Sequence, residues 1–323
     1  MKYQNVRIGS LAYALPDRVV ASEELEQRIA PLYERLGLHT GRLELMSGIQ
    51  TRRFWPKGTR PSHAAALAGR KALEQSGVDK ADIGVLIHSS VCRDFMEPAT
   101  ASVVHAALEM PRNALAFDLS NACLGFANAL GVAANMIESG EMKAALVVSG
   151  EDGGPLVEET LAWLSRGDEV SRRDLKAAFS SLTIGSGAVA AVLQRSEDPA
   201  QPGPRLLGTT ARSATEFNHL CSGDKSEGSS GPLMETDSEA LLQAGINLAE
   251  ETFAQFTQEH ALTPTGIDKV ITHQVGSAHR KLLFERLNLD LKKDYSTFPS
   301  LGNVGSVSMP ITLALAAENN FIH

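Results

Sequence analysis

The segment FDLSNACLGF, residues 117–126, decides the fold of this 323-residue chain. An apolar run from Ala114 to Leu119 predicts a short strand, and the apolar stretch 124–139 predicts a long helix. A turn of small residues joins them and holds Cys123. Ligands and catalytic groups of α/β proteins gather where strands end. The segment therefore predicts an α/β fold with a functional group at this junction.

Cys123 is the first candidate site residue. The thiol lies at the start of the expected helix, where free N–H groups and the helix dipole favour the thiolate. Because the thiolate is the nucleophilic form, this position suits a cysteine that takes part in acyl transfer. The alternative is a buried cysteine that packs as a small hydrophobic residue.

Two later junctions repeat this arrangement. In VITHQVG, residues 270–276, an apolar strand ends at His273 and a helix is expected to follow. In GNVGS, residues 302–306, Asn303 stands between glycines before another apolar helix. Taken alone, the histidine fits a core or capping residue and the asparagine fits a turn. Together with the cysteine they predict one site at the strand ends.

Composition excludes several classes of protein. The chain is 43% hydrophobic and 21% charged, with a net charge of −8 and no basic run, so neither nucleic acid nor an anionic membrane is an expected partner. Three cysteines without CxxC spacing argue against disulfides or a zinc site. No signal peptide or membrane-spanning run of about 18 apolar residues is seen, and a cytoplasmic enzyme is expected.

Strands alternate with helices along the whole chain, which predicts a layered α/β fold with parallel strand pairing. Ser22 is expected to cap the first helix. The strand at 267–273 and the turn at Asn303 repeat the order seen at 83–89 and Cys123, which indicates a duplication. Strands are predicted at 6–14, 83–89, 114–119, 144–149 and 267–273, and helices at 62–75, 100–109, 124–139, 277–287 and 307–318.

Several motifs resemble one family. The strings DLSNACLGF, THQVG and LGNVGSVSMP are similar to the active-site blocks of β-ketoacyl synthase III enzymes of the thiolase superfamily. The segments VRIGSLAYALP, GIQTRR and GSGAVAAVL match in the same order. The resemblance implies a thiolase fold of duplicated βαβαβαββ halves in α-β-α-β-α layers, the first at 1–172 and the second at 173–323. Family members continue beyond Asn319–His323 with two strands, so the second half is expected to lack its last strands.

The resemblance also implies a chemistry, the joining of two acyl thioesters into a β-keto product. Cys123 would carry the first acyl chain, and His273 and Asn303 would donate to the enolate oxygen of the second. The substrates would be acyl-CoA or acyl carrier protein thioesters, with no metal and no cofactor. Synthase III enzymes obtain the carbanion by loss of carbon dioxide from a malonyl thioester.

The block RDFMEPAT, residues 93–100, points to a different second step. It is similar to an olefin-biosynthesis thiolase that joins two acyl-CoA chains head to head. The matching Glu97 would reach into the partner subunit and remove the α-proton of the second chain, since a condensation without decarboxylation needs a base. A homodimer with Phe95, Met96 and Ala99 near its interface is therefore expected. The alternative is a charge that stabilises the start of a helix.

Other functions stay open. The chain has Val275-Gly276 where the family has Ala-Asn, and Gln50 where an arginine that faces CoA is expected. An acyltransferase that moves the acyl group to an oxygen or nitrogen would need Cys123 and His273 but not Glu97. A non-catalytic partner subunit often lacks the cysteine, and a papain-like hydrolase has a different sequence around it.

Overall fold

The computed structural model describes residues 1–166, 170–198, 203–223 and 234–322. Its strands are β1 Val6–Ala14, β2 Arg18–Ala21, β3 Thr51–Phe54, β4 Ile83–His88, β5 Leu115–Asp118, β6 Ala144–Glu151, β7 Gly187–Arg195, β8 Cys221–Gly223 and β9 Met234–Thr236. Its α-helices are α1 Ser22–Arg28, α2 Ala30–Arg35, α3 Arg42–Ser47, α4 Pro61–Ser76, α5 Thr100–Ala107, α6 Gly125–Glu138, α7 Gly154–Leu164, α8 Arg172–Ala178, α9 Ser238–His260, α10 Ser277–Arg286, α11 Phe298–Leu301 and α12 Ser308–Glu318.

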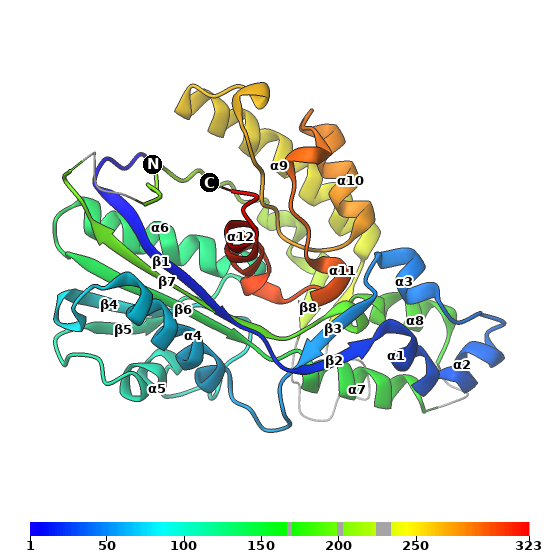
Figure 1. Ribbon diagram of the computed structural model, residues 1–323. Coiled ribbons are helices and arrows are strands. Elements are labelled where there is room, and N and C mark those ends of the chain that lie inside the picture. Colours follow the sequence, from blue (N-terminus) through cyan, green and yellow to red (C-terminus); the bar gives the residue numbers. More distant parts are fainter. Residues whose placement is uncertain (167–169, 199–202, 224–233, 323) are drawn as a thin grey trace.

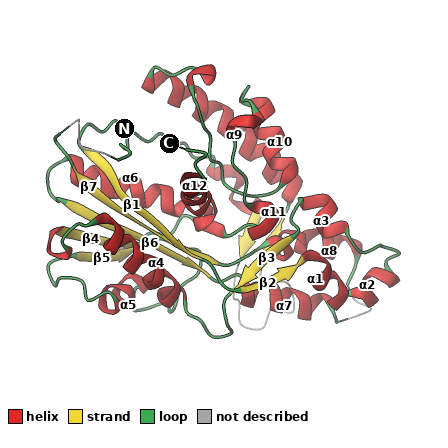
Figure 2. Ribbon diagram, viewed as in Figure 1, coloured by secondary structure: helices red, strands yellow, loops and turns green. Residues whose placement is uncertain are grey.

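A five-stranded mixed sheet forms the centre of the molecule, in the order β1-β7-β6-β4-β5. Strands β5, β4 and β6 run parallel, whereas β7 is antiparallel to β1 and β6. Helices α4 and α5 cover one face, and α6 and α12 cover the other (Figures 1 and 2). The sheet is therefore buried on both sides, which explains why its central strands read as continuous apolar runs.

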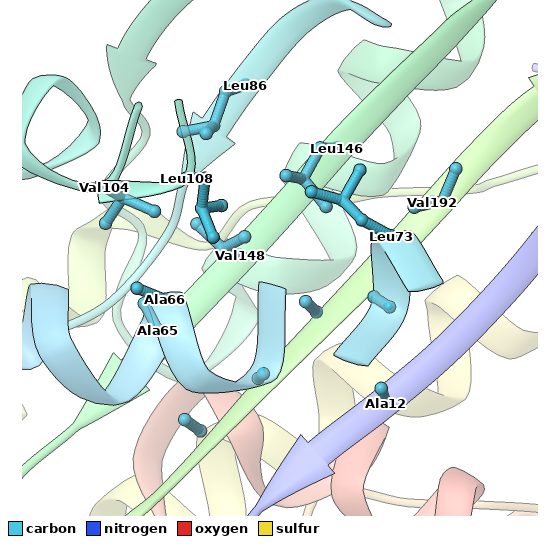
Figure 3. Packing of buried hydrophobic residues seen from close by; sticks show 14 of the residues in the cluster. Ala12, Ala65, Ala66, Leu73, Leu86, Val104, Leu108, Leu146, Val148 and Val192 are labelled. Carbon is cyan, nitrogen blue, oxygen red and sulfur yellow. The ribbon is translucent and has the colours of Figure 1, made fainter. Parts of the chain in front are cut away.

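The packing of α4 on the sheet depends on alanines. Ala65 and Ala66 face a cluster that includes Leu86 of β4, Val148 of β6 and Val192 of β7 (Figure 3). Alanine has the highest helix propensity, and its small side chain lets the helix lie close to the strands. The predicted helix at 62–75 is confirmed.

The opposite face confirms the central prediction of a strand followed by a long helix. Phe126, Ala129, Ala133 and Ile137 of α6 are fully buried against the sheet and recur at the spacing of one helical face. The predicted strands at 6–14, 83–89, 114–119 and 144–149 are present within one or two residues of their expected ends.

Two sequence predictions were wrong. The segment 267–273 forms no strand, because within the described residues its only ladder contact is a single bridge from Val270 to Asp294. A strand requires partners along its length. Ser22 does not cap α1, since Ala21 occupies that position and the Ser22 hydroxyl donates instead to the carbonyl of Ile49.

Other expectations stay as predictions. The expected boundary between 172 and 173 lies at the start of α8, and β7 beyond it pairs within the first sheet. Stretches rich in proline, glycine or serine at 197–204 and 222–231 predict surface loops, and both segments lie partly outside the described residues. Among the described helices, none has the length and apolar character needed to cross a membrane.

Candidate active site

Cys123 lies in a 3-10 turn, Ala122–Leu124, immediately before α6. Ala122 adopts a left-handed conformation with φ of 43°, which is unfavourable for alanine and makes the chain turn sharply at the cysteine. A Cβ on Gly125 would lie 2.4 Å from the hydroxyl oxygen of Ser89, so only glycine lets α6 begin this close to the end of β4. The local sequence therefore places the thiol where the strand ends meet.

The thiol is not activated by its position alone, contrary to the expectation from sequence. Burial, followed by electrostatic interactions with Glu151 and Cys221, raises the pKa of Cys123 to about 12. A hydrogen bond from its own backbone N–H lowers the pKa but is outweighed. The thiol therefore needs a proton acceptor when it attacks.

Asn303 lies on the turn between α11 and α12, and its backbone is held on both sides. Its N–H donates to the Thr183 carbonyl at 2.9 Å, and its carbonyl accepts from Gly185 N–H at 2.8 Å. The side-chain Oδ1 accepts from Gly305 N–H at 3.1 Å. These contacts orient the amide so that its NH2 group is left to donate.

His273 precedes α10, and its neighbour anchors it to the same region. The side chain of Gln274 accepts from the N–H groups of Thr297 and Phe298, at the start of α11. Burial, and secondarily the nearby His279, lowers the pKa of His273 to about 4. Its Nδ1 is buried and has no hydrogen-bond partner within the described residues. The imidazole is therefore neutral at pH 7 and able to accept a proton.

Glu97 lies on an exposed loop that is anchored at its base. The Asp94 carboxylate accepts from Ser62 N–H and hydroxyl at 2.9 and 2.6 Å, and Arg60 stacks 4.8 Å from the Phe95 ring centre. Beyond these contacts Met96 is 98% exposed. Glu97 follows it as an exposed residue, so this loop presents the carboxylate away from its own chain.

Asp118, and not Glu97, accepts the first hydrogen bonds of α5, which bears on the alternative interpretation of Glu97 as a helix-terminal charge. The first N–H groups of α5, from Thr100 and Ala101, donate to the two oxygens of Asp118 at 2.8 and 2.7 Å. Since Asp118 at the end of β5 fills that position, Glu97 is left available for another role.

Sequence reasoning missed Glu151. This residue ends β6, is 3% exposed, and contributes to the raised pKa of Cys123. Its position was open to prediction, because a carboxylate at the carboxyl end of a strand is a candidate site residue. Cys221 also acts on Cys123, and no signal in the sequence pointed to it.

The structure thus brings some predicted residues together and leaves one apart. The 3-10 turn of Cys123 packs against the 3-10 turn Gly305–Val307, which directly follows Asn303 and Val304. His273 joins this region through Gln274 and α11. Glu97 stays outside on its loop. The turns of Cys123 and Asn303 are therefore neighbours, His273 is connected to the adjacent α11 through Gln274, and a shared catalytic centre stays a prediction.

Comparison with known proteins identifies the family of this chain. Models of 3-oxoacyl-[acyl-carrier-protein] synthase III match residues 117–214 and, for its C-terminal part, 257–323, and the N-terminal thiolase domain matches 49–154. An acyl-CoA:acyl-CoA alkyltransferase of Shewanella oneidensis is 38% identical over all of this chain and 93% of its own length. The Xanthomonas campestris enzyme of that name is also 38% identical, over 98% of this chain and 92% of its own length.

This chain belongs to the acyl-CoA:acyl-CoA alkyltransferase family. Xanthomonas campestris OleA, solved with bound lauric acid and lauroyl-CoA, superposes with a TM-score of 0.94 at 36% identity, over 99% of this chain and 93% of that one. A cerulenin-bound OleA structure gives a TM-score of 0.95 at 37% identity, over 100% and 92% of the two chains. The fold is the thiolase fold, as expected, and the chain is an acyltransferase.

Proposed function

We propose that this alkyltransferase family member joins two acyl-CoA molecules head to head, without decarboxylation, through an acyl group on Cys123. The observation that carries this proposal is the placement of Glu97 on an anchored, outward-facing loop whose neighbouring helix is already capped by Asp118. A condensation of two acyl-CoAs requires a base for the α-proton, and this carboxylate is available for it.

In the first step the Cys123 sulfur attacks the thioester carbonyl. His273 is the proposed acceptor for the proton of the thiol, since its buried Nδ1 has no hydrogen-bond partner within the described residues. That proton then goes to the departing CoA sulfur as the carbon–sulfur bond of the first substrate breaks. The acyl chain remains on Cys123, and one CoA thiol is released.

In the second step Glu97 of a partner subunit removes the α-proton of a second acyl-CoA. The negative oxygen of the enolate is met by the amide of Asn303 and by His273. The enolate carbon attacks the acyl carbonyl on Cys123, the carbon–sulfur bond breaks, and Cys123 leaves as a thiolate that regains a proton. The product is a β-ketoacyl-CoA, and neither a metal nor a cofactor takes part.

A homodimer completes this site. The strand β5 lies at one edge of the sheet, and edge strands are suited to pairing with a second copy. Exposed apolar residues surround that edge, namely Val91, Phe95, Met96, Leu115 and Leu124. A twofold pairing at β5 covers these side chains and turns the loop of Glu97 toward the partner's Cys123. We place this dimer in the cytoplasm.

A decarboxylating condensation is the competing function. β-Ketoacyl-[acyl-carrier-protein] synthase III of Cereibacter sphaeroides is 29% identical over 95% of this chain and 88% of its own length. Transfer of the acyl group to an oxygen or nitrogen nucleophile would leave Glu97 without a function.

Mass spectrometry of the protein and its products distinguishes these functions. The enzyme is incubated with a long-chain acyl-CoA, in the presence and absence of a malonyl thioester. We expect an acyl adduct on Cys123 and, from acyl-CoA alone, an α-alkyl-β-ketoacyl-CoA that contains the carbons of both acyl chains. Product that appears only with the malonyl thioester would contradict the proposal, as would a stable acyl-enzyme that never condenses.

A further inference from the structure

The side chain of Glu151 accepts hydrogen bonds from two separate segments of the site. Its carboxylate accepts from the N–H groups of Val91 at 2.9 Å and Cys92 at 3.1 Å. It also accepts from the N–H of Ser306 at 3.2 Å and from the Ser306 hydroxyl at 2.6 Å. Four donors on one buried carboxyl group are typical of an ionised carboxylate.

These donors belong to the segments that carry two candidate catalytic groups. Val91 and Cys92 begin the loop that leads to Glu97, and Ser306 follows the turn of Asn303. A Cβ on Gly305 would lie 3.0 Å from the Glu151 carboxylate, so the turn approaches as closely as a glycine permits. A single side chain therefore fixes the distance between these two segments.

A chain of buried hydroxyl groups runs from Glu151 across the strand ends. The Ser306 hydroxyl lies 2.8 Å from that of Ser149, which lies 2.9 Å from that of Ser90. The Ser90 hydroxyl lies 3.2 Å from Nε2 of His88, and Nδ1 of His88 lies 3.5 Å from a carboxylate oxygen of Asp118. All three serines are buried, and His88 is 1% exposed.

The hydrogen bond next to Glu151 has a defined direction. An ionised Glu151 only accepts, so the Ser306 hydroxyl donates to it. Ser306 must then accept from Ser149, and Ser149 from Ser90. The Ser90 hydroxyl accepts from the N–H of Gly150 at 2.9 Å and lies beside Nε2 of His88, whose donor or acceptor role depends on its tautomer. Each hydroxyl in the chain has hydrogen-bond partners, and the Ser306 hydroxyl also lies 3.1 Å from the carbonyl oxygen of Ser89.

The two carboxylates at the ends of this hydrogen-bonded chain, Glu151 and Asp118, bind the two ends of the loop that carries Glu97. At one end Glu151 binds the N–H groups of Val91 and Cys92. At the other end Asp118 binds the N–H groups of Thr100 and Ala101, where the loop enters α5. Burial alone would raise the pKa of Asp118, but the hydrogen bonds from His88 and these N–H groups together lower it. Both anchoring groups are carboxylates connected through the same buried hydroxyls.

We propose that Glu151 is a positioning residue for condensation, and that the chain His88–Ser90–Ser149–Ser306 holds it in place. Glu151 keeps the loop of Glu97 and the turn of Asn303 at a fixed distance from each other and does not contact the substrate. The inference rests on the proposed function, because it assigns the second step to those two segments. Acylation of Cys123 requires neither the position of the loop nor that of the amide.

The charge of Glu151 provides a readout that a purely structural residue would not change. This carboxylate is one of the charges that raise the pKa of Cys123. A neutral glutamine at this position keeps the size of the side chain and removes the charge. The thiol should then be alkylated faster by iodoacetamide at a fixed pH near 8, even though the carboxylate is no longer there to receive its four donors.

The test compares the full-length parent with Glu151→Gln, Ser149→Ala and the double variant. Acylation of Cys123 and condensation are measured separately by mass spectrometry. We expect Glu151→Gln to acylate within about threefold of the parent and to condense about tenfold more slowly or worse, since a hydrogen-bonded charge is lost. Ser149→Ala leaves the carboxylate and its backbone donors in place, and it should slow condensation by a few-fold.

The double variant decides whether the hydroxyl chain acts through Glu151. If it does, Ser149→Ala causes no further loss once Glu151→Gln is present. Losses that multiply would overturn this coupling. Equal losses of acylation and condensation in Glu151→Gln, or unchanged alkylation of Cys123, would overturn the positioning role.

Two matched variants control for the substitutions themselves. Glu138→Gln changes another glutamate that accepts two backbone N–H groups, those of Gln4 and Asn5, on a different part of the surface. Ser181→Ala removes a buried hydroxyl that has no partner within the described residues. Both should match the parent. If the parent forms the acyl group on Cys123 but gives no condensation product, the proposed function fails. The alkylation rates of Cys123 in the parent and in Glu151→Gln then still test the role of Glu151.

Discussion

The carboxylate of Asp118 accepts a hydrogen bond from the N–H of Thr100 at 2.8 Å, and this contact separates two roles for Glu97. A helix start that lacked a cap would favour a nearby glutamate as its stabilising charge. Because Asp118 satisfies α5 from the neighbouring strand, Glu97 is not needed there. The exposed carboxylate is thereby available for the role that we propose for it in a partner subunit.

Glu97→Gln should still form the acyl group on Cys123 but should condense two acyl-CoAs about 10²–10⁴ times more slowly. Acylation needs only the thiol and its proton acceptor, whereas formation of the enolate needs a base. Product formation from acyl-CoA alone measures the effect, with the exposed Glu141→Gln as control. Full activity of Glu97→Gln would eliminate the base and favour a decarboxylating reaction.

Asn303→Ala should slow condensation by about 10²–10³-fold, the usual effect of removing one donor to an oxyanion. Acylation should persist, because the amide is proposed to meet the enolate of the second chain. Single-turnover experiments with pre-acylated enzyme isolate this step. An Asn303→Ala enzyme that condenses at the parental rate would remove the amide from the site.

Cys123→Ala should abolish the acyl adduct completely. The chain has two other cysteines, Cys92 and Cys221, and the pKa of Cys92 is raised well above its ordinary value by burial. Peptide mapping after incubation with acyl-CoA locates the adduct, and an adduct that survives in Cys123→Ala would assign the acyl group to another residue.

Light scattering at micromolar concentration should show a homodimer. Met96→Lys places a charge on a side chain that is 98% exposed in one subunit and covered in the proposed dimer, so it should weaken association and lower condensation together. Leu45→Lys is a suitable control, because Leu45 is 82% exposed on α3, far from β5 in Figure 1. A monomeric parent would contradict both the dimer and a base supplied by the partner.

Stability should fall as the pH is lowered from about 6.5 to about 4. His273 has a folded pKa of about 4, below its ordinary value of 6.5, so the unfolded chain binds the proton first over this range. The stabilising contribution of the neutral imidazole is therefore fully present above pH 6.5. As the pH falls from about 6.5 to about 4, this contribution decreases by at most about 1.4 kcal/mol for each pH unit. Chemical denaturation at several pH values measures the slope, and His273→Asn should reduce it. An unchanged slope would contradict a buried, neutral imidazole.

Local patterns predicted the first half of the molecule well. The strand before Cys123 and the helix after it are visible in the sequence because apolar side chains at strand and helix spacing have few other ways to be buried. Candidate groups at Cys123, His273 and Asn303 could be proposed for the same reason, since each follows an apolar run and precedes a helix. Their chemical roles stay predictions.

The strand expected at 267–273 shows where such reasoning fails. Its residues have a strand-like pattern, yet only Val270 finds a partner, Asp294, among the described residues. A strand depends on neighbours that are distant in sequence, and apolar character alone does not supply them. The same limit explains why Ser22 looked like a cap but donates its hydrogen bond to Ile49.

The sequence by itself determined the α/β class, the candidate nucleophile and the family resemblance, because these depend on residue types and short spacings. The tertiary structure alone decided that Asp118 caps α5, that burial and Glu151 raise the pKa of Cys123, and that three serines connect Glu151 to His88. The physical reason is that hydrogen bonds and electrostatic fields depend on distances in space. Ser306 and Ser149 are 157 residues apart in the chain, yet their hydroxyls lie 2.8 Å from each other.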